Sequence, residues 1–139
     1  MIHEFLASRE ALAEFIGAWE AGVLPKARWT HAAHIAVGTY YAVCYPESAL
    51  VKTRQGIIRY NEAVGTANTD TSGYHETLTC FWAALLARAA AGIDDPFEAV
   101  RRNVELYVEN RNLHQRYYSF DVVRSVEARR TWIPPDVSP

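Results

Sequence analysis

The sequence has few of the residues that would place it in several common classes of protein. It contains only two cysteines, Cys44 and Cys80, which stand far apart in apolar surroundings, so there is neither a dense disulfide framework nor a Cys-x-x-Cys motif. We therefore expect two free, buried thiols in a reducing, cytoplasmic environment. The longest stretch without charge, residues 29–46, is shorter than the roughly 20 residues that a membrane span needs. The N-terminal sequence has no basic stretch followed by an apolar run, so no signal peptide is predicted.

Charge of one sign is not in excess either. The 139 residues include 14 Lys and Arg against 16 Asp and Glu, which gives a net charge of −2 at pH 7. That balance does not favour nucleic acid or an anionic membrane as a partner. Half of the residues are hydrophobic and 12% are aromatic, which excludes a disordered chain. We expect a single soluble domain over residues 1–139, because folding at this length removes about 68% of the unfolded surface from water.

Helical periodicity dominates the sequence, and the alternation typical of strands is almost absent. Apolar residues at helical spacing predict a first helix from about residue 5 that ends before Gly22 and Pro25. Ser119 and Ser125 are suitable caps for two short helical pieces near the C-terminus. The other predicted helices cover about 30–45, 46–64, 74–91 and 96–110, with one long polar loop at 65–73. We predict an all-α fold, a bundle of four or five helices with a short helical or irregular C-terminal tail.

The second predicted helix is unusual because residues 31–45, HAAHIAVGTYYAVCY, contain no charged side chain. A helix that is apolar all round belongs in the centre of a core. Thr30 directly precedes this helix and is a suitable N-cap for it. The helix nevertheless carries His31 and His34 on one face near its N-terminus. Both rings need partners, because burying an unpaired imidazole costs on the order of 1–3 kcal/mol.

A second polar cluster, YHET, opens the fourth predicted helix and contains His75 and Glu76. If the two helices face each other, His31, His34 and His75 meet at one end of the bundle, where helix N-termini favour the neutral imidazole that binds a metal. Three imidazoles plus a carboxylate from Glu76 or Asp70 suit zinc, or iron if a ligand position stays open. The predicted activity is then metal-dependent hydrolysis or hydration of a small molecule, with Glu76 or Asp70 as the general base.

Other candidate residues lie close to these clusters in the sequence. Tyr41, Tyr60 and Tyr74 are candidate phenolic donors to a substrate, and Arg59 is a candidate for orienting an anionic substrate. His114 is flanked by polar residues, so we predict that it is exposed rather than part of the site.

Alternatives to a metal centre remain open at this point. The stronger metal spacings, such as His-Glu-x-x-His and Glu-x-x-His, are absent, and a His-x-x-His pair occurs by chance in many helices. The histidines could instead form a metal-free hydrogen-bond network around a small ligand, or a purely structural network in the subunit of a homo-oligomer. Likewise, the loop at 65–73 could offer backbone N–H groups to an anion, or could simply cap the helix that follows it.

Several blocks of the sequence resemble a family of small bacterial proteins of unknown function. The blocks are WTHAAH at 29–34, RYNEAVGT at 59–66 and NTDTSGYHET at 68–77, and ARRTWIPPD at 128–136 is similar to the family's closing motif. The resemblance covers most of the chain from Trp29 onward. It implies no particular activity, but it implies that the two histidine-containing blocks belong to one site.

Overall fold

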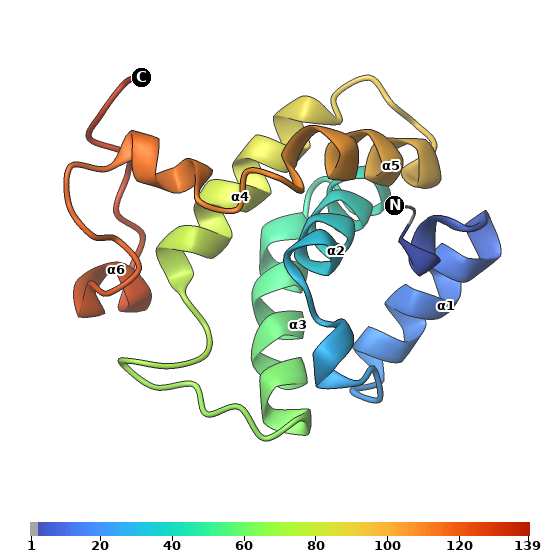
Figure 1. Ribbon diagram of the computed structural model, residues 1–139, viewed down its shortest axis with the longest axis horizontal. Coiled ribbons are helices and arrows are strands. Elements are labelled where there is room, and N and C mark those ends of the chain that lie inside the picture. The colour runs from blue at the N-terminus through green and yellow to red at the C-terminus, as the bar shows by residue number, and fades with distance from the viewer. Residues whose placement is uncertain (1–2) are drawn as a thin grey trace.

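The computed structural model describes residues 3–139, and the fold of these residues is all-α (Figure 1). The predicted fold class is therefore confirmed, and no helix in this range is long and apolar enough to cross a membrane. The helices are α1 (Arg9–Glu20), α2 (His31–Cys44), α3 (Ala49–Ala63), α4 (Glu76–Ala89), α5 (Pro96–Tyr107) and α6 (Val126–Arg130). Three short 3-10 helices join them: η1 (Glu4–Leu6), η2 (Lys26–Arg28) and η3 (Leu113–Tyr117).

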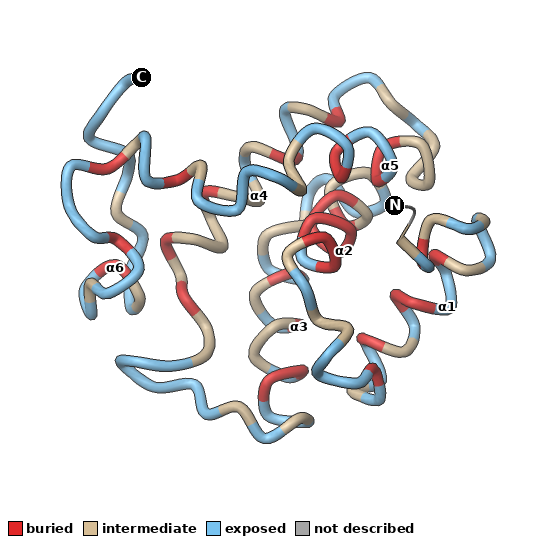
Figure 2. The backbone as a smooth tube through the Cα atoms, viewed as in Figure 1, coloured by how far each residue is buried: buried red, intermediate tan, exposed pale blue. Residues whose placement is uncertain are grey.

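Helix α2 lies in the middle of the fold, as its uncharged sequence predicts. It packs against α3, α4 and α5, and most of its length is buried (Figure 2). Its N-terminus is capped as expected, because Oγ1 of Thr30 accepts a hydrogen bond of 3.2 Å from the backbone N–H of Ala33. The buried residues of α2 are Ala32, Ala33, Ile35, Ala36, Val37, Gly38, Thr39 and Tyr41.

Aromatic side chains fill the core between α1, α2 and α3. The indole of Trp19 is only 1% exposed, and its ring centroid lies 5.2 Å from that of Trp29, 6.2 Å from that of Tyr41 and 6.1 Å from that of Tyr60. These spacings are those of stacked and tilted aromatic pairs, which add to the stabilisation from burial. The cluster holds η2 and the first turn of α2 in place.

Helix α4 crosses α2 at Gly38. A Cβ atom on Gly38 would lie only 2.9 Å from Cδ1 of Leu86, so the missing side chain permits this close approach. Asn103 of α5 is fully buried and ties the crossing together, since its Nδ2 donates to Oγ1 of Thr39 (3.0 Å) and to the carbonyl of Leu86 (3.1 Å). The angle between α2 and α4 is therefore fixed by both packing and hydrogen bonds.

The C-terminal segment, residues 113–136, folds against the first half of α4 (Figure 1). Ser125 caps α6 as predicted, with Oγ accepting from the backbone N–H of Ala128 at 3.1 Å. The helical piece predicted at Ser119 is wrong, because the hydroxyl of Ser119 instead hydrogen-bonds the carboxylate of Asp136 and holds the tail back on itself. The residues buried between the segment and α4 are Phe81 of α4 and Tyr118, Val122 and Ala128 of the segment.

Three helix starts differ from the prediction, and side-chain caps explain two of them, those of α1 and α4. Helix α1 begins at Arg9, since Oγ of Ser8 accepts from the N–H of Ala11 and separates η1 from α1. Helix α3 begins at Ala49 rather than at Pro46, which lies in the preceding turn. Helix α4 begins two residues later than predicted because His75 is its N-cap.

Both cysteines are free thiols, but only one of them is shielded. Cys44 is exposed, contrary to prediction, because α2 ends there. Cys80 is partly buried, and its thiol donates to the carboxylate of Glu76 at 3.5 Å. Burial and the nearby Glu76 raise the pKa of the Cys80 thiol to about 11, so it is not a reactive thiolate.

Candidate ligand-binding cavity

A cavity of about 710 Å³ lies between α2, α3 and α4. Its wall is completed by η2, by the loop between α3 and α4, and by the turn that follows α5. Sites for small molecules usually have volumes of about 300–1,000 Å³, so the cavity is large enough for an organic ligand. Its polar and aromatic lining includes Lys26, Trp29, Thr30, His31, His34, Thr53, Asn61, Tyr74, His75, Thr79, Trp82 and Arg111.

His31, His34 and His75 all line this one cavity, so the two predicted histidine clusters do come together. They do not form a metal-ligand group, however. Across residues 3–139, no three His, Cys, Asp or Glu side chains are arranged so that they could hold a metal ion. The hydrogen bonds of each ring explain why.

His75 uses both ring nitrogens to bind backbone groups. Its Nδ1 accepts from the N–H of Leu78 (3.2 Å) as the N-cap of α4, and its Nε2–H donates to the carbonyl of Val122 (2.9 Å). The ring is 7% exposed, and burial lowers its pKa, which keeps it neutral. His75 therefore anchors the start of α4 to the C-terminal segment and has no free lone pair for a metal.

His31 has one backbone partner. Its Nε2–H donates to the carbonyl of Tyr107 (3.1 Å), and the edge of its ring meets Trp82, with the centroids 5.2 Å apart. Burial lowers the pKa of His31, and the positive charge of Arg111 lowers it further. The imidazole therefore links α2 to the end of α5 as a neutral ring.

His34 is held in place on one side and left open on the other. Its Nδ1–H donates to the carbonyl of Thr30 (2.8 Å), and its ring stacks on Trp29 with centroids 3.8 Å apart. The residue is exposed to solvent on the cavity wall. The pKa of His34 is lowered, mainly by neighbouring protein atoms that displace water from the ring and less by His31 and Arg111. At neutral pH the ring is uncharged, and Nε2 carries a lone pair that has no partner within residues 3–139.

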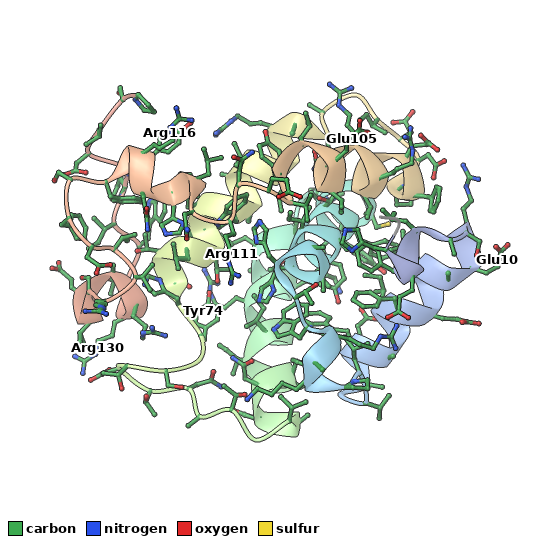
Figure 3. The ribbon with its side chains drawn as sticks, in the orientation of Figure 1. Glu10, Tyr74, Glu105, Arg111, Arg116 and Arg130 are labelled. Atoms are coloured by element: carbon green, nitrogen blue, oxygen red, sulfur yellow. The ribbon has the colours of Figure 1, made fainter. Side chains whose placement is uncertain are left out.

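Two cations of the cavity wall were not singled out by the sequence, Lys26 of η2 and Arg111 of the turn after α5. None of the ion pairs within residues 3–139 includes either of them. Figure 3 shows Arg111 and Tyr74 in the space between α4 and α2, whereas Arg116 lies away from it. No Asp or Glu is among the described residues that line the cavity. The wall is therefore positively charged.

The two predicted general bases lie outside the cavity lining. The carboxylate of Glu76 accepts two hydrogen bonds from Arg54, at 2.9 and 2.8 Å, and one of 2.5 Å from the hydroxyl of Tyr74. The Arg54 guanidinium lowers the pKa of Glu76. Asp70 is exposed and is paired with Arg130 of α6. Both carboxylates are thus held in ion pairs with arginines of the protein.

Of the four predicted substrate-contacting residues, only Tyr74 lines the cavity. The hydroxyl of Tyr41 donates to Glu20 (2.5 Å), and that of Tyr60 donates to the carbonyl of Leu24 (2.7 Å). Both rings belong to the aromatic core around α1. Arg59 is exposed on α3 and is also absent from the cavity wall.

The polar loop before α4 is organised by Asn68. Its Oδ1 accepts from Nδ2 of Asn61 (2.9 Å) and from the N–H of Tyr74 (2.9 Å). Gly73 has a φ of +76° and an added Cβ would lie 2.5 Å from a backbone oxygen, so glycine is required there. Arg129 of α6 donates to the carbonyls of Gly73 (2.9 Å) and Tyr74 (3.3 Å). These bonds favour the turn-cap alternative for the loop over an anion site.

The prediction for His114 is wrong. Its side chain is only 4% exposed, because η3 packs onto α4 with this residue facing inward. Neither ring nitrogen of His114 has a hydrogen-bond partner within residues 3–139, and burial lowers its pKa. His114 does not line the cavity. After burial, the next largest cause that lowers its pKa is His75.

Comparison of the chain with models of protein families, with curated proteins and with solved structures gives no match. The family resemblance therefore stays a prediction. What can be inferred about function depends on the composition and geometry of the cavity.

Proposed function

We propose that the protein binds a small organic anion in this cavity without the help of a metal ion. The observation that carries the proposal is the charge of the wall: Lys26 and Arg111 contribute two positive charges, and no lining residue contributes a negative one. Cations without a carboxylate partner at a concave surface attract an anion, and a guanidinium suits carboxylate or phosphate oxygens best. The lowered pKa values of His31 and His34 leave these rings as hydrogen-bonding groups rather than charges.

The rest of the wall favours an organic ligand over an inorganic ion. Apolar side chains from all three helices line the cavity, namely Ile35, Ile57, Leu78, Trp82, Ala83 and Leu86. Apolar walls with a few polar groups are typical of sites that enclose most of a small molecule. A metal-dependent hydrolase has less support, because both nitrogens of His75 are engaged and Glu76 is neutralised by Arg54.

The test is calorimetric titration of the protein with 3-phenylpropionate and with phenyl phosphate, compared with the neutral 3-phenylpropionamide. We expect the anions to bind and the amide to bind far more weakly. Arg111→Met should weaken anion binding about tenfold or more, the usual loss for one charged hydrogen bond. Arg116→Met is the matched control, because Arg116 is exposed outside the cavity and its loss should change nothing. Equal binding of acid and amide, or no binding of either anion at millimolar concentration, would overturn the proposal.

Metal content is measured in parallel on protein purified without a histidine tag. We expect no stoichiometric metal and a melting temperature that a chelator does not change. A stoichiometric zinc or iron ion that disappears in His31→Ala would overturn the metal-free site and restore the predicted metal centre. A cytoplasmic location, predicted from the low cysteine content, is proposed together with this function.

A further inference from the structure

We propose that His34 is a specificity-determining residue and that the anion bound in the cavity carries a hydroxyl group next to its charge, as a 2-hydroxy acid does. This inference rests on the proposed anion site, and it concerns which anions the site prefers. It is carried by the imidazole of His34, whose position and tautomer are fixed by one hydrogen bond while its outer nitrogen is left without a partner.

The geometry of His34 gives it one defined role. Because Nδ1 is 2.8 Å from the carbonyl of Thr30, it carries the ring proton and donates it there, so Nε2 can only accept. Stacking on Trp29, with centroids 3.8 Å apart, prevents the ring from turning away. Nε2 is the ring atom farthest from the attachment to α2, and His34 lines the cavity from the first turn of that helix.

The other two histidines of the wall are less suited to this role. His75 has no free nitrogen, because Leu78 and Val122 engage both of them. His31 donates through Nε2 to Tyr107, so its free nitrogen is Nδ1, which lies beside the ring's own attachment to the helix. Only in His34 is the free lone pair at the tip of the ring.

The neighbours of His34 indicate where the matching donor sits on the ligand. Lys26 and Arg111 offer only donors, so they bind the anionic oxygens but cannot satisfy Nε2. Arg111 and His34 line the same cavity, so one small ligand can contact both the cation and the acceptor. Such a ligand has an acidic group and a hydroxyl. A ligand that has a carboxylate but no hydroxyl covers Nε2 without donating a hydrogen bond to it. Sites that are built to bind a hydroxyl reject analogues without one for this reason.

The test compares 3-phenyllactate with 3-phenylpropionate, which share the ring and the carboxylate and differ by one hydroxyl. Wild-type protein should bind the hydroxy acid about three- to tenfold more tightly, the range expected for one added hydrogen bond. His34→Phe keeps a flat ring on Trp29 but removes the acceptor, so the two acids should bind equally. His34→Gln places an amide oxygen near the position of Nε2 and should restore part of the preference.

A spectroscopic measurement separates a direct contact from an indirect effect. The ¹⁵N resonance of the His34 Nε2 atom should move when 3-phenyllactate is added and should stay nearly unchanged with 3-phenylpropionate. Equal affinity of the wild-type protein for the two acids, or an unchanged preference in His34→Phe, would overturn the role of His34 while leaving the anion site standing. Failure of both acids to bind would remove the anion site itself and this inference with it.

Discussion

Thr77 and Thr53 are two buried threonines that differ in one respect, the hydrogen bonds of their hydroxyl groups. Thr77 is fully buried at the start of α4, and its Oγ1 donates to the carbonyl of Thr131 (2.8 Å) and accepts from the N–H of Ile133 (3.0 Å). Thr53 is 7% exposed on α3, and its Oγ1 is covered from solvent without any partner. Replacing each by valine exchanges the hydroxyl for a methyl group of nearly the same shape.

The two substitutions should therefore change stability in different directions. Thr77→Val leaves two backbone groups of the C-terminal segment without their partner, and we expect it to lower the free energy of unfolding by about 1–3 kcal/mol. Thr53→Val removes a hydroxyl that is buried and unpaired, so the free energy of unfolding should stay unchanged or rise by up to about 1 kcal/mol. In a chain of this size each kcal/mol corresponds to a shift in melting temperature of roughly 3–5 °C.

Urea unfolding followed by far-ultraviolet circular dichroism measures both effects. We expect the midpoint to fall in Thr77→Val and to hold or rise in Thr53→Val, with the same dependence on urea in both, since the surface exposed on unfolding is unchanged. If Thr53→Val were destabilised as much as Thr77→Val, the hydroxyl of Thr53 would have a partner, and the reasoning would be refuted.

Four further substitutions, one of them a control, test other parts of the fold. Arg129→Met should lower the free energy of unfolding by about 1–2 kcal/mol, because the Arg129 side chain donates hydrogen bonds to two loop carbonyls. Arg130→Met is the control and should change this free energy little, because the ion pair of Arg130 is exposed. Thermal melting compares the two variants. Asn103→Leu should cost about 2 kcal/mol or more by leaving two buried acceptors unpaired, and an unchanged urea midpoint would contradict this. His114 has a folded-state pKa below its ordinary value near 6.5, so the unfolded chain takes up the proton first and stability falls as pH drops below about 6.5. His114→Leu should therefore reduce that acid-side loss in urea titrations between pH 7 and pH 5, and an identical pH slope would count against it.

The helices could be predicted where local chemistry decides them. The uncharged run of α2 can be satisfied only in the middle of a core, and Thr30 and Ser125 cap their helices with the side-chain oxygens that such positions favour. The start of α4 could not be placed from the sequence, because the cap is a ring nitrogen of His75 rather than a residue that commonly caps helices. In the structure this cap engages Nδ1 of His75, one of the three rings of the predicted metal centre, which stays a prediction.

The site itself was only half predictable. His31 and His34 were found because two imidazoles in an apolar helix demand an explanation, and both line the cavity. Lys26 and Arg111 lie in short turns without any periodic pattern, so only the folded chain shows that they face the same space. His114 was misjudged because its neighbours in the sequence are polar, while a 3-10 turn of five residues buries this single side chain.

The hydrogen bonds from residues 122–133 to residues 73–77 have a consequence for the order in which the protein is completed. The carbonyl of Val122, the guanidinium of Arg129 and the backbone of Thr131 and Ile133 hold the first turn of α4, which belongs to the cavity wall. During translation, about 50 further residues are added after this turn before its last partner leaves the ribosome. The nascent chain therefore has α2 and α3 well before it has a finished cavity wall, because the wall at the start of α4 needs residues 122–133 in place.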